Sequence, residues 1–138
     1  FIERARKVRQ MLGGGMRQAG IIAAPGIIAL EKMVDRLRDD HENARILAEG
    51  LVRVEGISIN METVQTNIVV FDVGGLGTDS DRFISELKEH GVKATRLGKT
   101  LVRMVTHRGI EREDIEHALD AVEGVARRYS PNKPRNWG

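Results

Sequence analysis

The sequence predicts an α/β chain in which three helical segments precede a small α+β unit with the order β-β-α-β-β-α. Apolar residues recur at helical spacing, or fill every position, through most of residues 1–54. Residues 67–73 are rich in β-branched side chains, and residues 101–106 form a second apolar run with polar breaks on both sides. These patterns predict a small antiparallel or mixed sheet with two helices on one face.

Three helical segments are predicted in the first 54 residues. Residues 1–11 have helical spacing and end at the triple glycine 13–15, because glycines carry a large entropy cost inside a helix. Residues 21–30 are apolar on every side, which predicts a helix that is buried all round and kinked or restarted at Pro25. Residues 31–54 carry one apolar stripe among charges, which predicts a long amphipathic surface helix.

The second half is predicted to contain, in order, strands over 57–60 and 67–73, a helix lined by Phe83, Ile84 and Leu87, strands over 92–95 and 101–106, and a helix from Ile115 to Tyr129. Thr78 with Asp81 resembles a capping box at the start of the middle helix, and Gly91 suits its end. Residues 131–138 are predicted to form a polar tail.

Composition limits the classes of function. The 138 residues are 41% hydrophobic and 30% charged, which suits one domain or a piece of a larger one rather than a disordered or membrane chain. The absence of cysteine excludes disulfides and thiolate metal sites, and the four histidines lack metal-ligand spacing. A net charge of +2 gives little reason to expect nucleic acid or an acidic membrane as a partner.

The first half has more apolar helix surface than the small sheet can cover, so it must pack on missing chain or on another subunit. The chain also begins at Phe1, inside a charged helical pattern, which suggests that upstream residues are missing. We therefore expect the 138 residues to be part of a larger structure.

Two arginines are candidates for anion binding. Arg17 lies in the stretch GGGMRQAG at residues 13–20, where glycines would let a backbone approach a ligand and the arginine offers a planar fork of donors. A flexible loop with a solvated arginine is the alternative. Arg103 interrupts an apolar strand, and a charge there needs a partner unless the strand is an edge strand with the arginine head in water.

Residues 5–20, ARKVRQMLGGGMRQAG, resemble the segment that follows the cofactor lysine in the low-specificity threonine aldolase family. The resemblance continues through IAAPGIIAL at 22–30, TNIV at 66–69 and VRMVTH at 102–107, and covers nearly the whole chain up to Tyr129. The GGGMRQAG block is highly specific and the arginine strand moderately so. Gln10 stands where some members have a lysine near the active site, which leaves that charge in doubt, and His107 is either near the site or a polar strand end.

The resemblance implies the C-terminal part of a fold-type I pyridoxal-phosphate (PLP) enzyme. Residues 1–30 would end the large PLP-binding domain, 31–54 would form the interdomain helix, and 55–130 would form the small domain. Arg17 would help to hold the PLP phosphate and Arg103 would bind the substrate carboxylate. The PLP lysine would lie upstream, so the chain alone would hold no catalytic residue and be inactive, and no metal is implied.

The implied reaction is cleavage of L-threonine or L-allo-threonine to glycine and an aldehyde, in the amino-acid metabolism of the cytoplasm, by a homotetramer. Two other interpretations remain open. The chain could belong to another fold-type I PLP enzyme, such as a β-eliminating lyase, or be a stand-alone α/β regulatory or interaction domain. An RNA-binding module is disfavoured, because only 4% of the residues are aromatic.

Overall fold

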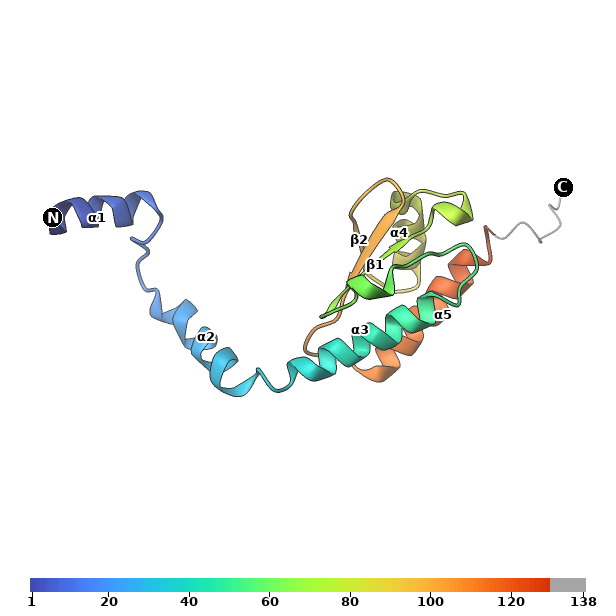
Figure 1. The fold of residues 1–138 in the computed structure, drawn as a ribbon, viewed down its shortest axis with the longest axis horizontal. Helices are drawn as coiled ribbons and strands as arrows, with labels where there is room; N and C mark the ends of the chain where they lie inside the picture. The colour runs from blue at the N-terminus through green and yellow to red at the C-terminus, as the bar shows by residue number, and fades with distance from the viewer. Residues whose placement is uncertain (130–138) are drawn as a thin grey trace. The chain divides into compact units, whose positions relative to one another are not determined.

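The computed structural model describes residues 1–129 (Figure 1). Its elements are α1 (Ile2–Met11), α2 (Gly20–Lys32), α3 (Leu37–Leu51), a 3₁₀ turn (Met61–Thr63), β1 (Ile68–Asp72), a 3₁₀ turn (Gly74–Leu76), α4 (Ser80–Glu89), β2 (Thr95–Arg96), β3 (Leu101–Val105) and α5 (Arg112–Ala126). The polar tail predicted for 131–138 lies outside the described residues. The chain divides into two compact units, one ending at Arg36 and one beginning at Leu37.

The second unit is built on a three-stranded antiparallel sheet with the order β1-β3-β2. Strand alternation turns Val69 and Phe71 of β1, and Val102 and Met104 of β3, toward the helices, where all four are buried. Helices α3 and α4 contact the sheet, and α5 packs against both of them (Figure 1). The predicted α/β class with a small antiparallel sheet is confirmed. Two helices were expected on one face of the sheet, α4 and α5, and α3 packs on the same side.

Aromatic and aliphatic side chains from α3, β1, α4, β3 and α5 fill one core. Phe71 and Phe83 meet edge to face, with ring centroids 6.3 Å apart, and both are essentially inaccessible to solvent. Burying each such side chain contributes roughly 1.5–3 kcal/mol to the stability of the fold. The core therefore holds β1 and β3, the two longer strands, in a fixed relation to α4.

The predicted long helix over 31–54 is wrong at its start. Apolar residues recur at helical spacing up to Leu37 and again from Ala44, but α2 continues to Lys32, the backbone leaves helical geometry at Met33, and α3 begins only at Leu37. Asp39 and Asp40 lie in the first turn of α3, where carboxylates are favoured by the partial positive charge of a helix N-terminus. The assignment of 1–30, 31–54 and 55–130 to separate domains stays a prediction.

Two predicted strands are shorter than expected. Residues 57–60 form only one isolated bridge, between Ser58 and Asp72, because Asn60 instead caps the following 3₁₀ turn by accepting a hydrogen bond from the Glu62 N–H at 3.0 Å. Residues 92–94 are also outside the sheet, and β2 is only the pair Thr95–Arg96. The sheet thus has three strands instead of the four predicted, and its edge strand β2 is short.

The cap of α4 lies one residue later than predicted. Asp79, rather than Thr78, is the N-cap, and its Oδ1 accepts a hydrogen bond from the Arg82 N–H at 2.9 Å. Gly91 follows the helix with a φ of +79°, a conformation that glycine adopts without strain, as its predicted role at the helix end requires.

The first unit consists of α1 and α2, and neither helix has a buried residue. Helix α2 runs continuously through Pro25, and its large apolar side chains are open to solvent, with Ile21 exposed to 75% and Leu30 to 77%. Within this chain α2 is not buried, and its predicted burial against missing chain or another subunit stays a prediction. The surplus apolar surface that the sequence predicts is nevertheless present.

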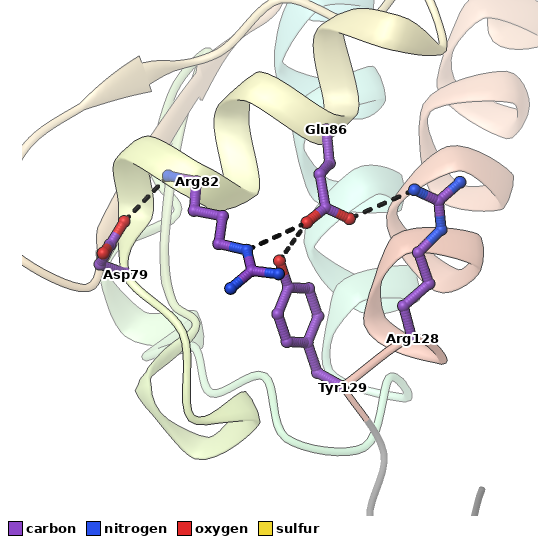
Figure 2. A network of polar contacts seen from close by, with 5 residues as sticks. All are labelled: Asp79, Arg82, Glu86, Arg128 and Tyr129. Atoms are coloured by element: carbon purple, nitrogen blue, oxygen red, sulfur yellow. Dashed lines mark hydrogen bonds and ion pairs between the residues drawn. The ribbon is translucent and has the colours of Figure 1, made fainter. Parts of the chain in front are cut away.

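A polar cluster fastens the end of α5 to α4 (Figure 2). The Glu86 carboxylate, largely buried, accepts a hydrogen bond from the Tyr129 hydroxyl and pairs with Arg128 at 3.3 Å and Arg82 at 3.5 Å. The Arg82 guanidinium also lies 5.4 Å from the centre of the Tyr129 ring. Burial raises the pKa of Tyr129, and the hydrogen bond to Glu86 raises it further.

This cluster predicts a loss of stability at alkaline pH. Because the folded pKa of Tyr129 lies above the unfolded value of 10.0, its contribution is complete below pH 10 and is lost as the pH rises through the folded value. We expect the free energy of unfolding, measured by urea denaturation, to fall more steeply above pH 10 in the wild-type chain than in Tyr129→Phe. Parallel pH profiles for the two chains would contradict this role for the hydroxyl.

Candidate functional site

The side of the sheet opposite the helices is not covered within the second unit. We call it the open face, and it is formed by the alternate residues that do not enter the core: Ile68, Val70, Asp72, Thr95, Leu101, Arg103 and Val105. None of these side chains is buried, whereas their neighbours along β1 and β3 are. The open face is therefore a mostly apolar surface with one basic side chain in its central strand.

Arg103 is placed on the open face by the pattern of its own strand. Val102 and Met104 on either side are buried against the helices, so alternation directs Arg103 the other way. Its partners across the sheet are Val70 on β1 and Thr95 on β2. The structure thus makes it a residue of the central strand, and the alternative of an edge-strand arginine is wrong.

The guanidinium of Arg103 has one polar partner among the side chains of residues 1–129. Its Nε–H donates to the Thr95 hydroxyl oxygen at 3.1 Å, and this hydroxyl donates to the Arg103 carbonyl oxygen at 3.3 Å. No carboxylate of the described residues forms an ion pair with it. A half-buried positive charge on an apolar surface, with its two terminal amino groups unpaired there, is suited to bind a planar anion.

The end of β3 is fixed by one buried and one partly buried hydrogen bond. The Thr106 hydroxyl donates to the Asp40 carbonyl oxygen of α3 at 2.6 Å, and the Asn67 side-chain amide donates to the Thr106 carbonyl oxygen at 2.7 Å. Thr106 itself is 2% exposed. The first bond ties the strand that carries Arg103 to α3 and the second ties it to the start of β1, which limits how far the arginine can shift.

Arg17 lies between α1 and α2, and its side chain is exposed. The glycines before it fold back on the end of α1: Gly13 has a φ of +80°, and a Cβ atom built on Gly15 would lie 1.9 Å from the amide oxygen of the Gln10 side chain. From the sequence, these glycines could let the backbone approach a ligand or form a flexible loop. In this structure, the group that approaches Gly15 is Gln10.

Arg17 belongs to the first unit and Arg103 to the second. His107 follows β3, is exposed, and places its Nδ1 atom 2.9 Å from the carbonyl oxygen of the adjacent Arg108. These local contacts fit a polar strand end.

The described lysines are all exposed: Lys7, Lys32, Lys88, Lys93 and Lys99. Lys133 lies outside the described residues. Up to residue 129, no three His, Asp or Glu side chains gather where they could hold a metal ion. Over the same part of the chain, no helix is both long enough and apolar enough to cross a membrane.

Sequence reasoning missed Thr95 as a site residue. A signal was available, because the predicted strands 92–95 and 101–106 flank a short connection containing Gly98, and a hairpin centred on Lys99 pairs Thr95 with Arg103. Directly paired residues of an antiparallel hairpin share a face. The identity of the arginine's neighbour could therefore have been derived from the register.

Comparisons with known proteins find a matching lyase family and similar threonine aldolases. The family model described as "Beta-eliminating lyase" matches residues 1–73. Low-specificity L-threonine aldolase 1 of Arabidopsis thaliana is 36% identical over 89% of this chain and 35% of its own length. The low specificity L-threonine aldolase of Escherichia coli strain K12 is 39% identical over 83% of this chain and 32% of its own length.

One solved structure is similar in fold. It is described as MppP soaked with the product 2-ketoarginine, and it matches 72% of this chain and 30% of its own with a TM-score of 0.58 and 19% sequence identity. The chain spans about a third of the length of the curated relatives it matches.

Proposed function

The chain belongs to the β-eliminating lyase family, and from this premise we propose that it is the C-terminal part of a PLP-dependent aldolase that cleaves L-threonine and L-allo-threonine to glycine and an aldehyde. The likeness to MppP confirms the predicted fold, the C-terminal part of a fold-type I chain. The threonine aldolases of plant and bacterial origin, similar over most of this chain, support the proposed reaction.

The observation that carries the proposal is the arginine on the open face. An amino-acid substrate presents a carboxylate, and Arg103 presents two terminal amino groups that no carboxylate of the described residues occupies. A guanidinium and a carboxylate match in a bidentate pair, which fixes orientation as well as position. Arg103 would therefore hold the substrate carboxylate and keep the substituents of Cα in a constant arrangement.

The described residues could form the part of a PLP site that binds the cofactor phosphate, but not the part that holds the cofactor lysine. Arg17 is exposed at the start of the segment leading into α2, whose first turn contains no acidic side chain, and it would hold the cofactor phosphate. None of the five described lysines is buried, so the lysine that binds the cofactor would lie outside residues 1–129. When bound, PLP would delocalise the electron pair left on Cα after cleavage of the Cα–Cβ bond.

We also propose that the apolar surface of α2 is covered in the whole protein, by the rest of its chain and by neighbouring copies in a homotetramer. Five isoleucine and leucine side chains of α2 are exposed in this structure: Ile21, Ile22, Ile27, Ile28 and Leu30. An apolar surface of this kind is typical of a buried interface rather than of a helix that stays in water.

Product analysis of the full-length protein tests the reaction. With PLP and L-threonine, we expect glycine and acetaldehyde in equal amounts, because cleavage of the Cα–Cβ bond divides the substrate into these two molecules. Loss of the β-hydroxyl would instead give 2-oxobutyrate and ammonia. Formation of these products without glycine would reject the aldolase in favour of a β-eliminating lyase, the second candidate that the family match supports.

A second expectation concerns the 138-residue chain by itself. Mixed with PLP and reduced with borohydride, it should show only scattered, low-level labelling of its surface lysines in peptide mass spectra, because no described lysine has a buried environment that favours attachment. Stoichiometric labelling of one lysine, with an absorbance band that disappears when this lysine is replaced, would show that the chain holds its own PLP lysine.

A further inference from the structure

Thr95 is the side chain that contacts the head group of Arg103. Its hydroxyl oxygen accepts the Nε–H of the arginine at 3.1 Å and donates its own hydrogen to the Arg103 carbonyl oxygen at 3.3 Å. The two residues are direct partners in the β2–β3 ladder, so their side chains emerge on the same face. The threonine is thus tied to both the backbone and the side chain of the same arginine.

This contact leaves a defined part of the guanidinium for a ligand. An arginine can pair with a carboxylate through its Nε and one terminal nitrogen, or through its two terminal nitrogens. With Nε occupied by Thr95, the second mode remains. We infer that Thr95 is the positioning residue for Arg103, aiming its two terminal amino groups at the carboxylate of the amino-acid substrate. This inference rests on the proposed function of Arg103.

The contact with Thr95 preorganises the Arg103 side chain for binding. A long arginine side chain loses conformational freedom when it binds, and this cost lowers affinity unless the free protein has already restricted the side chain. Threonine suits the task because its branched Cβ limits rotation about χ1. Its hydrogen bond to the backbone of the facing strand further fixes the hydroxyl. A serine would keep the hydroxyl but lose part of this rigidity.

The test compares Thr95→Val and Thr95→Ser in the full-length protein with PLP. The carboxylate is bound before and during the reaction, so we expect Thr95→Val to raise KM for L-threonine about threefold to tenfold with little change in kcat. Thr95→Ser should recover most of the loss, and the PLP affinity of the apo protein should not change. Thr100→Val is the matched control, since this threonine lies just before β3 and its hydroxyl bonds to no described residue.

The hydrogen bond can also be measured without activity. In the 138-residue chain, the Arg103 Nε–H should exchange slowly with water by nitrogen-15 NMR, and Thr95→Val should speed this exchange while Thr95→Ser does not. Thermal unfolding of the variants shows whether a loss of fold, rather than of positioning, is responsible. A variant that unfolds at the wild-type temperature with unchanged exchange and unchanged KM would overturn the inference.

Arg103→Ala separates this inference from the proposed function. If Arg103→Ala raises KM and Thr95→Val does not, the positioning role is wrong and the carboxylate site stands. If neither substitution affects KM, the carboxylate site itself is wrong. In the Arg103→Ala background, Thr95→Val should have no additional effect on KM, because the group that it positions is absent. An equal rise in KM in both backgrounds would show that Thr95 acts independently of the arginine.

Discussion

Replacing Arg103 by alanine in the full-length protein should lower kcat/KM for L-threonine about tenfold to a thousandfold, because a bidentate charge pair with the substrate carboxylate is lost. PLP binding should remain close to normal, since the proposed cofactor contact belongs to Arg17. Steady-state kinetics at saturating PLP, with a separate PLP titration, distinguishes these two effects.

Arg103→Lys should recover only part of the loss, because an ammonium group keeps the charge but not the planar fork. Arg112→Ala is a suitable control. It removes an exposed arginine that pairs with Glu116 four residues later at 3.4 Å, an interaction of little energetic weight. Near-normal kinetics of Arg103→Ala would make the residue a solvated arginine on an open sheet rather than a substrate ligand.

Replacing Arg17 by alanine should raise the dissociation constant for PLP about tenfold to a hundredfold, the range expected when a charge-assisted contact to a phosphate is removed. Arg17→Lys should recover part of the affinity. PLP titration of the apo protein measures this effect, and size-exclusion chromatography of the same samples shows whether the oligomer dissociates as the anion contact is lost.

The matched control for Arg17 is Arg6→Ala, which removes an exposed arginine of α1 from the same unit. Its PLP affinity should equal that of the wild type. Unchanged PLP affinity in Arg17→Ala would reject the phosphate contact, whatever happened to turnover. A loss of affinity shared by Arg6→Ala would point to a general effect of basic charge rather than to one contact.

The position of Arg103 illustrates what the sequence can predict. The run 101–106 is bounded by polar residues, and the observed strand Leu101–Val105 ends one residue earlier. Strand alternation then separates Arg103 from the buried Val102 and Met104. The sequence left open whether this strand lies at the edge of the sheet, and the observed strand order settles that it is central. The role of Arg103 toward a substrate stays a prediction.

The break before α3 and the loss of the strand at 57–60 could not be predicted, because they depend on local hydrogen bonds and backbone geometry rather than on the spacing of apolar residues. The stripe that crosses 31–54 is compatible with one long helix, yet the backbone breaks between Lys32 and Leu37. The strand expected at 57–60 was replaced by the cap that Asn60 supplies. The triple glycine was compatible with a backbone that approaches a ligand or with a flexible loop, and neither interpretation included the Gln10 side chain, which lies against Gly15 in the structure.

Recognition of a carboxylate by Arg103 can be measured as discrimination between two ligands that differ only in this group. In glycinamide, a neutral amide replaces the carboxylate of glycine. Spectral titration of the full-length protein with PLP gives the dissociation constant of each ligand, both for the wild type and for Arg103→Ala. We expect the wild type to bind glycine at least tenfold more tightly, and the variant to lose most of this preference. A preference for glycine that survives intact in Arg103→Ala would contradict the assignment of the open face as the carboxylate site.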